Sequence, residues 1–318
     1  MAERTRVARR RFLMGAVAAG GALLVGWGAQ PPRQRLHPST PLAPGGDAVA
    51  LNGWVAIGAD GVVSVAVARS EMGQGVHTAL PMLVAEELDV PMDAVRVIQP
   101  PVDGIYANVA VLRESLPFHP DDGDAVVQGA QWLAAKLGRE LGIMFTGGSS
   151  SVRDAWLPLR EAGAVARAML VRAAARGWGA READCRTEDG AVIHADGRRI
   201  GYGALAPLAA RHDGIDAGDV RLKEPREFRL IGKPVARLDS RAKSDGSARF
   251  GIDARPAGMV YAALKMAPLL GAGVAAFDAD ADAVRRMPGV LAVVDVSPVL
   301  LEHSGAAAGV AVVAEHWW

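Results

Sequence analysis

Alternating hydrophobic and polar positions predict the first elements of this chain. Two alternating runs, at residues 54–58 and 62–67, flank the pair Asp60-Gly61, and Asp-Gly between such runs predicts a β-hairpin. Hydrophobic residues then recur with a helical period over residues 78–88, which indicates a helix with one buried face. The short apolar run at residues 95–98 predicts another strand.

Longer helical patterns occupy the middle of the chain. The pattern at residues 122–141 predicts a helix whose inner face carries four apolar residues, Val126, Ala130, Leu133 and Leu137. A second pattern covers residues 152–178, where Pro158 predicts either a kink or a late helix start. Residues 191–202 predict a further hairpin around Asp196-Gly197.

The segment at residues 213–229 is rich in Gly, Asp, Arg and Pro, which predicts a domain boundary. Beyond it, a helical pattern near residues 280–287 lies among three apolar runs that predict strands, at residues 260–266, 290–296 and 310–314. Strands interleaved with helices, together with hairpins, favour an α+β or mixed α/β fold over a doubly wound sheet.

The composition limits what the chain can hold by itself. Its 318 residues, half of them hydrophobic, suffice for two domains. The 35 basic and 35 acidic residues balance, so we expect no nucleic-acid partner. Cys185 is the single cysteine, which excludes an internal disulfide and an iron–sulfur cluster held by four thiolates of this chain. We expect Cys185 to be a buried structural thiol, and any electron carriers to lie on another chain.

The N-terminus has the pattern of an export signal. Five arginines precede an apolar run at residues 14–27, and residues 9–14 (RRRFLM) match the twin-arginine pattern. We expect a signal over residues 1–29, export of the folded protein, and a location in the periplasm or at the outer face of the inner membrane. An uncleaved signal that anchors the chain in the membrane is the alternative. The proline-rich residues 30–47 predict an extended tether.

Two loops carry the candidate chemistry, because each leads into a predicted helix. In the first, Gly73 and Gly75 flank Gln74, so backbone and an amide side chain can approach a ligand beside a helix N-terminus. A tight turn without a ligand is the alternative. The second loop offers the small and hydroxyl residues that a phosphate or pyrophosphate site needs, and a helix N-cap is its alternative. Its members are Thr146, Gly147, Gly148, Ser149, Ser150 and Ser151.

Three stretches around these loops closely resemble the molybdopterin-binding subunits of the xanthine oxidase family, and within it the exported isoquinoline 1-oxidoreductase type. They are residues 70–80 (SEMGQGVHTAL), 84–88 (VAEEL) and 146–152 (TGGSSSV). Residues 237–250, which begin with Arg237-Leu238-Asp239, are similar to the start of that family's α/β hammerhead domain. The resemblance implies a molybdopterin-binding domain at residues 48–212, a linker at 213–229 and a hammerhead-like domain at 230–318.

The resemblance also implies a molybdopterin-type molybdenum cofactor, with or without a cytosine nucleotide. Gly73, Gln74 and Gly75 would lie against its metal end, and Thr146 with Ser149, Ser150 and Ser151 would hold its tail. The implied reaction is hydroxylation of a carbon in an N-heteroaromatic or aldehyde substrate, with the oxygen taken from water. Electrons would leave through iron–sulfur clusters on a small partner subunit.

The chain departs from the family at its end. It stops at Trp318, inside the hammerhead-like stretch, so we expect either a truncated chain or a C-terminal half supplied as a separate chain. We therefore name no catalytic base. Glu71 and Glu86 are expected to be helix caps or solvated carboxylates. His77 is expected to face solvent, and contact with the cofactor is its alternative. Arg153 has two interpretations, a phosphate partner or a surface salt bridge.

Three hypotheses follow for function. The first is the cofactor-binding portion of an exported molybdenum hydroxylase that acts on a small molecule. The second is a remnant that holds no metal and at most contacts other proteins. The third is an exported phosphate or nucleotide binder built on the loop at residues 146–151. Molybdenum content separates the first hypothesis from the other two.

Overall fold

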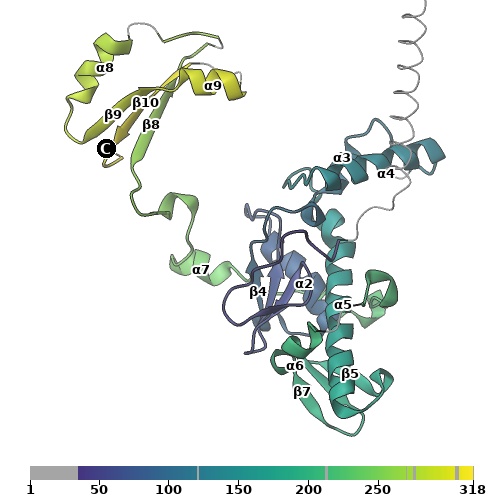
Figure 1. Ribbon diagram of the computed structural model, residues 1–318. Coiled ribbons are helices and arrows are strands. Elements are labelled where there is room, and N and C mark those ends of the chain that lie inside the picture. The colour runs from purple at the N-terminus through teal and green to yellow at the C-terminus, as the bar shows by residue number, and fades with distance from the viewer. Residues whose placement is uncertain are drawn as a thin grey trace, which may run out of the picture. The chain divides into compact units, whose positions relative to one another are not determined.

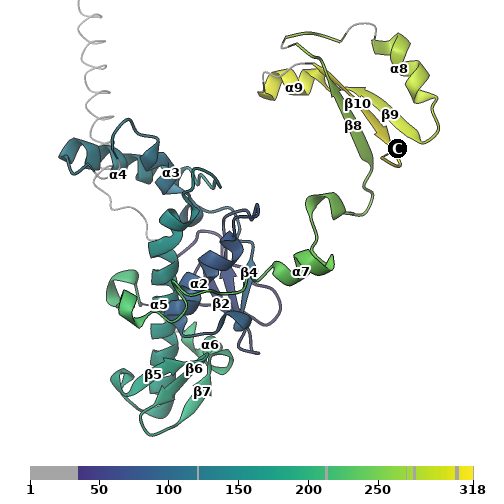
Figure 2. The same ribbon diagram turned by 180° about the vertical axis from the view of Figure 1, so that it is seen from behind.

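The computed structural model describes residues 35–119, 122–211, 214–269, 271–274, 277–304 and 308–317. The predicted signal at residues 1–29 lies outside them and stays a prediction. The chain forms two compact units, one ending at Gly246 and one beginning at Ser247, and Figures 1 and 2 present them from opposite sides. The described part of the predicted tether packs against the first unit, because Leu36 and Leu42 are buried in its core.

The first unit is built on a four-stranded sheet with the order β1-β2-β3-β4. β1 (Val49–Ala50), β2 (Val55–Ile57) and β3 (Val63–Ala66) are antiparallel neighbours, which confirms the first predicted hairpin. β4 (Val95–Ile98) pairs in parallel with β3, and α2 (Val76–Leu88) makes the crossover that parallel strands require. β2 and β3 are buried throughout, so this sheet forms the centre of the core.

The longest helix, α5 (Ser151–Trp178), packs along α2. At the contact stands Gly163, where a Cβ atom would lie 2.9 Å from both the Val84 carbonyl oxygen and the Glu87 Cβ. The missing side chain therefore lets the two helices approach closely, and both bury their facing sides against each other and the sheet.

Pro158 lies inside α5, which begins at Ser151. The alternative of a late helix start at this proline is therefore wrong. A proline has no N–H, so the carbonyl four residues earlier, that of Asp154, loses its helical partner. The Arg35 guanidinium replaces it, since Nη1 donates to this carbonyl at 3.2 Å.

Beside this core, α3 (Val109–Glu114) packs on α4 (Ala125–Glu140). The inner face predicted for α4 is wrong, because Val126, Leu133 and Leu137 are 73%, 42% and 43% exposed. The buried face instead carries small residues such as Gly138, where a Cβ would lie 2.3 Å from Leu112 Cδ1. Close contact with α3 selects small residues, so the large apolar side chains of α4 remain outside.

A second sheet of order β5-β6-β7 lies at the C-terminal end of α5. It comprises β5 (Cys185–Glu188), β6 (Ala191–His194) and β7 (Arg199–Gly201), all antiparallel, which confirms the predicted hairpin. α6 (Tyr202–Ala209) follows directly. Cys185 begins an edge strand and is only partly buried, so the prediction of a buried thiol is wrong, although what burial it has raises the pKa of the thiol.

Residues 214–246 belong to the first unit. They form 3-10 turns and one short helix, α7 (Ser240–Asp245), and pack on the first unit through contacts described below. The family-domain limits at residues 48–212 and 230–318 stay predictions. The 3-10 turns of the unit are η1 (Met92–Ala94), η2 (Gly104–Tyr106), η3 (Glu182–Asp184), η4 (Ala217–Asp219) and η5 (Pro225–Glu227).

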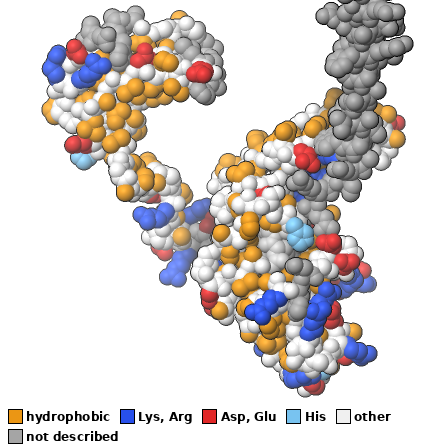
Figure 3. All heavy atoms as spheres, viewed as in Figure 1, with side chains coloured by type: hydrophobic (Ala, Val, Ile, Leu, Met, Phe, Trp, Pro, Cys, Tyr) orange, Lys and Arg blue, Asp and Glu red, His pale blue; other side chains and the backbone are white. Residues whose placement is uncertain are grey.

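The second unit is a three-stranded antiparallel sheet of order β8-β10-β9 with helices beside it. Its strands confirm the predicted ones, and α8 confirms the predicted helix. Figure 3 shows apolar side chains exposed on this unit. Leu264 and Leu291 of this unit are each 52% exposed. Its elements are η6 (Gly251–Asp253), β8 (Tyr261–Met266), α8 (Phe277–Arg285), β9 (Val290–Asp295), α9 (Ser297–Ser304) and β10 (Gly309–Ala314).

The close approach of α2 and α5 predicts a large effect for Gly163→Ala. The added methyl must displace backbone of α2, so we expect a loss of about 1–3 kcal/mol in the free energy of unfolding, measured in urea. Gly177→Ala is the matched control in the same helix, because a Cβ at Gly177 meets no atom within 4 Å. It should stabilise the chain by about 0.5–1 kcal/mol. Equal effects of the two substitutions would contradict the packing described here.

Candidate functional site

The glycine loop before α2 is closed on itself by the carboxylate of Glu71. Gly73 and Gly75 have φ values of +102° and +83°, a left-handed conformation that glycine adopts without strain. Glu71 Oε1 accepts from the N–H groups of Gly73 and Gly75 at 2.9 Å, and Oε2 accepts from the His77 N–H at 3.0 Å. Glu71 is therefore a cap, as one of its two interpretations predicted, and it occupies the positive end of α2.

These contacts also set the charge state of Glu71. Burial alone would raise the pKa of its carboxyl, but the N–H groups of His77, Gly75 and Gly73 outweigh burial, and the pKa is lowered. Arg237 adds to the effect, since its guanidinium lies 3.3 Å from Glu71 Oε1. The carboxylate is thus held in its ionised form beside the loop.

Gln74 and His77 both turn toward their own loop. Gln74 Nε2 donates to the Ser70 carbonyl at 2.8 Å, and Gln74 Oε1 accepts from the Met72 N–H at 2.5 Å. His77 Nε2 lies 3.0 Å from the Arg69 carbonyl oxygen, so the expectation that His77 faces solvent is wrong. A ligand that used the Gln74 amide would have to replace both of its present bonds.

The second loop presents a different surface. Gly148 and Ser149 are exposed and adopt left-handed φ values of +59° and +51°, which is strained for serine. Ser150 is fully buried: its hydroxyl donates to the Gly147 carbonyl at 2.6 Å and accepts from Asn108 Nδ2 at 2.6 Å. The Ser150 hydroxyl is therefore used for hydrogen bonds within the protein, whereas the Ser149 side chain is exposed to solvent.

The loop leads into the N-terminus of α5, which has no side-chain cap. This helix is 28 residues long, and its first N–H groups and dipole favour an anion. Arg153, in its first turn, pairs with Glu114 at 2.6 Å, which confirms the salt-bridge interpretation. The two helix ends therefore differ. Glu71 accepts from an N–H group at the start of α2, whereas no side chain caps the start of α5, and Asp154 in its first turn accepts from Arg35, Arg69 and the Val109 N–H instead.

The two loops lie side by side. The Ser70 N–H donates to Thr146 Oγ1 at 3.0 Å. Ser70 directly precedes the glycine loop, and Thr146 is the first residue of the second loop, which we call the serine loop. Sequence distance gives no sign of this contact, because the partners are 76 positions apart. The structure thus brings together the two segments that the sequence predicted to share one ligand.

A buried carboxylate, that of Asp154, lies behind both loops. Its Oδ2 accepts from Arg35 at 3.0 Å and from Arg69 at 2.7 Å. Its Oδ1 accepts from the N–H groups of Val109 and Ala110 at 2.8 and 3.3 Å. Four segments of the first unit thus meet at one side chain. Sequence reasoning missed Asp154, because an acidic residue in the first turn of a helix is common and shows nothing of its distant partners.

Arg69 is held tightly beside Asp154. Its Nη1 donates to the carbonyls of Ala68 and Tyr106, both at 2.9 Å. Its Nε is buried and lacks a hydrogen-bond partner in the part of the chain that the structure describes. Burial is the largest influence on the Arg69 guanidinium and lowers its pKa.

Glu86 and Glu87 hold a segment that we call the strap, residues 221–231. Glu86 accepts from the N–H groups of Arg229, Leu230 and Ile231, with the Leu230 bond at 2.7 Å. Glu87 pairs with Arg160 at 2.7 Å. Glu86 is 1% exposed and lies within α2, so the expectation of a cap or a solvated carboxylate is wrong for it.

Residues beyond the strap contact the glycine loop. Arg237 Nη1 donates to the Gly73 carbonyl at 3.0 Å, and the Leu238 N–H donates to Thr78 Oγ1 at 3.0 Å. The segment Arg237-Leu238-Asp239, which resembles the start of the hammerhead domain, thus lies against the first predicted site in this structure.

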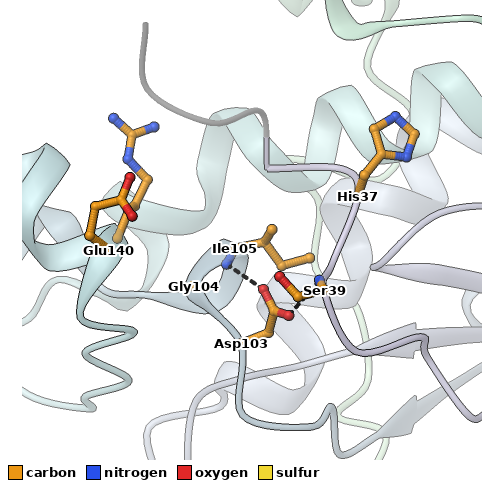
Figure 4. Close-up of a pocket in the computed structure, with 7 residues that line it drawn as sticks. His37, Ser39, Asp103, Gly104, Ile105 and Glu140 are labelled. Atoms are coloured by element: carbon orange, nitrogen blue, oxygen red, sulfur yellow. Dashed lines mark hydrogen bonds between the residues drawn. The ribbon is translucent and has the colours of Figure 1, made fainter. Parts of the chain in front are cut away.

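A cavity of about 160 Å³ lies elsewhere, between the N-terminal segment and η2. In Figure 4, Asp103 bonds Ser39 and Ile105, and His37 and Glu140 lie at the edges. None of the predicted site residues lines it. Within the described ranges, no three His, Cys, Asp or Glu side chains are grouped to hold a metal ion. No helix in that part of the chain is long and apolar enough to cross a membrane.

A comparison with protein families places part of the chain in a known domain family. A family model described as "Molybdopterin cofactor-binding domain" matches residues 3–109. The matched range includes Gly73, Gln74 and Gly75, and it ends before the loop at residues 146–151.

Three curated proteins are similar in sequence. The beta subunit of isoquinoline 1-oxidoreductase from Brevundimonas diminuta is 32% identical over 91% of this chain and 37% of that protein. The membrane-bound aldehyde dehydrogenase [pyrroloquinoline-quinone] of Gluconacetobacter polyoxogenes is 29% identical over 84% of this chain and 30% of that protein. One of the subunits of nicotinate dehydrogenase from Pseudomonas putida is 28% identical over 76% of this chain and 18% of that protein.

The chain therefore spans between 18% and 37% of the length of these relatives. Among solved structures, quinoline 2-oxidoreductase from Pseudomonas putida 86 aligns with a TM-score of 0.31 and 19% identity, over 51% of this chain and 17% of that one.

The network at Asp154 predicts a large effect for Asp154→Asn. The substitution leaves two guanidinium groups around an uncharged amide, so we expect a loss of about 3–5 kcal/mol in the free energy of unfolding. Asp184→Asn is the control, because Asp184 pairs with Arg181 on the surface and such pairs contribute little. Urea unfolding measures both, and a similar change in the two variants would contradict the central role of Asp154.

The hydrogen bonds between Glu86 and the strap predict that the fold is less stable in acid. Burial would raise the pKa of Glu86, but the N–H groups of Leu230, Ile231 and Arg229 and the Lys223 ammonium lower it below its usual 4.5. A lowered pKa stabilises the fold above about pH 4.5, and this stabilisation is lost as the pH falls through the folded value. Glu71 acts in the same direction.

We therefore expect the free energy of unfolding to fall as the pH drops below about 5. Glu86→Gln should be less stable than the wild type at neutral pH and should lose less on acidification. Glu140→Gln, at an exposed glutamate, should follow the wild-type curve. An unchanged acid response in Glu86→Gln would show that the strap does not carry this pH dependence.

Proposed function

We propose that this chain, which belongs to the xanthine oxidase family of molybdopterin-binding subunits, is the cofactor-binding portion of an exported hydroxylase or dehydrogenase. The family model and the 32% identity to a component of isoquinoline 1-oxidoreductase support the cofactor class. The names of two relatives, an isoquinoline oxidoreductase and a nicotinate dehydrogenase, favour an N-heteroaromatic substrate, and that of the third favours an aldehyde.

The observation that carries the proposal is the uncapped start of α5 beside the exposed residues Gly148 and Ser149. A molybdopterin cofactor has an anionic phosphate or pyrophosphate tail, and this surface offers backbone N–H groups, a helix dipole and a hydroxyl. The donor set thus fits the tail. Gly147, Gly148, Ser149 and Ser151 would hold it, and the Ser150 hydroxyl would keep the loop in shape.

The glycine loop fits the cofactor in a more limited way. A Cβ at Gly73 or Gly75 would meet no atom within 4 Å, so the absence of side chains leaves open space in front of the backbone. The N–H groups of both residues are already bonded to Glu71. Gln74 is therefore the group that would turn toward the metal end, exchanging its bonds to Ser70 and Met72 for a bond to the cofactor.

When bound, the cofactor would supply the two-electron oxidation by which a substrate carbon gains an oxygen atom from water. The residues of this chain would bind and orient it. Electrons would pass to iron–sulfur clusters on a small partner subunit, since the single cysteine cannot hold a four-thiolate cluster here. This chain spans 37% of the length of the isoquinoline relative, and the proposal concerns the part of the site that these residues form.

Three further features belong to the same proposal. The second unit would be the hammerhead-like domain, which its alternation of strands and helices supports. The twin-arginine pattern would direct the folded protein to the periplasm. The cofactor would carry a cytosine nucleotide if the uncapped end of α5 binds a second phosphate.

A non-catalytic chain that holds no molybdenum is the second candidate. The observation that favours it is the cap on α2, because Glu71 already fills the positive end of the helix beside the predicted metal end. A phosphate binder without molybdenum would use the same α5 surface. Metal content distinguishes both from the leading proposal.

The test is co-expression of the full chain with an iron–sulfur small subunit and the remaining length of the large subunit. Molybdenum and iron are measured by elemental analysis, and pyrroloquinoline quinone by mass spectrometry. We expect molybdenum in stoichiometric amount and no quinone. Absence of molybdenum from every preparation would overturn the proposal, and quinone in its place would assign the chain to a different cofactor.

Two substitutions at Ser149 sharpen this test. Ser149→Ala removes the hydroxyl and keeps the strained backbone, whereas Ser149→Gly removes the hydroxyl and relieves the strain. If the hydroxyl binds the tail, both variants should retain molybdenum roughly 2- to 10-fold less well than the wild type. Full retention by both variants would show that the Ser149 hydroxyl does not bind the tail.

A further inference from the structure

Two hydrogen-bonded contacts join the glycine loop to the serine loop and to the helix that follows it. The Ser70 N–H donates to Thr146 Oγ1 at 3.0 Å. One residue earlier, the Arg69 guanidinium donates to Asp154 Oδ2 at 2.7 Å, in the first turn of the helix that the serine loop begins. The dipeptide Arg69-Ser70 is thus bound to both ends of the segment from Thr146 to Asp154.

Contacts of His77 and Glu71 hold the other end of the glycine loop. The His77 ring lies 3.0 Å from the Arg69 carbonyl oxygen, and the Glu71 carboxylate spans the N–H groups from Gly73 to His77. The loop is therefore a closed unit internally. It continues into α2, which packs on α5, and Arg237 contacts Gly73, while the bonds of Arg69 and Ser70 join it directly to the serine loop and to the first turn of α5.

We infer that Thr146 is a positioning residue: its hydroxyl, together with the Asp154 carboxylate, fixes the distance between the glycine loop and the serine loop. This inference rests on the proposed function, since it concerns two halves of the same cofactor site. It separates Thr146 from Ser149, whose exposed side chain is open to a ligand. A cofactor that spans both loops binds well only if they are held at the matching distance.

Thr146→Val tests this role, because valine keeps the shape of threonine and removes the acceptor. The primary readout is amide hydrogen exchange of residues 69–77 in the full chain without cofactor. The Ser70 amide should exchange roughly 3- to 10-fold faster in Thr146→Val, and Thr146→Ser should restore wild-type exchange. Thr187→Val is the matched control, since it removes a hydroxyl bond to Asp89 and should leave residues 69–77 unchanged.

The second readout is molybdenum retention in the co-expressed complex. We expect Thr146→Val to retain several-fold less molybdenum and Thr146→Ser to recover it. Loss of molybdenum in Thr146→Val with unchanged exchange in the empty protein would make Thr146 a direct ligand and overturn the inference. Faster exchange of the Ser70 amide together with full retention of molybdenum would also overturn the inference. The hydrogen bond between Ser70 and Thr146 would then not matter for cofactor binding.

The two readouts keep this inference distinct from the proposed function. If the wild-type complex holds no molybdenum, the proposed function fails, and the exchange experiment alone decides whether Thr146 fixes the glycine loop. Unchanged exchange in Thr146→Val then overturns the positioning role as well.

Discussion

The first unit depends on one buried carboxylate, that of Asp154. Its two oxygens accept four hydrogen bonds, two from arginines and two from backbone N–H groups. The partners come from the N-terminal segment, the approach to the glycine loop and the start of α3, and Asp154 itself belongs to α5. A buried charge is tolerated only with such partners. The same network leaves the Arg69 Nε atom without a partner among the described residues, close to the start of the glycine loop.

The two helix N-termini of the candidate site show how similar sequence signals produce different surfaces. Both follow glycine-containing loops, and both offer unpaired N–H groups in principle. At α2 the chain supplies its own anion, Glu71, whereas α5 has no side-chain cap. An external anion therefore has more to gain at α5. The glycine loop is instead closed by its own hydrogen bonds, including the two made by the Gln74 amide.

The sequence predicted local elements well and long-range partners poorly. The hairpins around Asp60-Gly61 and Asp196-Gly197 follow from turn chemistry that neighbouring residues determine. The buried face of α4 was predicted wrongly, because periodicity shows which side is apolar and leaves open which neighbour covers it. Glu86 was interpreted as a cap or a solvated group, since its partners Arg229, Leu230 and Ile231 are more than 140 positions away. The Ser70–Thr146 contact was hidden for the same reason.

The strap also constrains the order in which the chain can fold. Glu86 and Glu87 lie on a buried part of α2, and their N–H partners are 136 to 145 positions later in the chain. During synthesis α2 and α5 leave the ribosome before the strap, which follows on the order of seconds later at ~5–20 residues per second. In that interval Glu86 and Glu87 lack their backbone N–H partners in the strap, which opposes burial of both carboxylates. The complete set of bonds to these carboxylates therefore forms only after Ile231 has been synthesised.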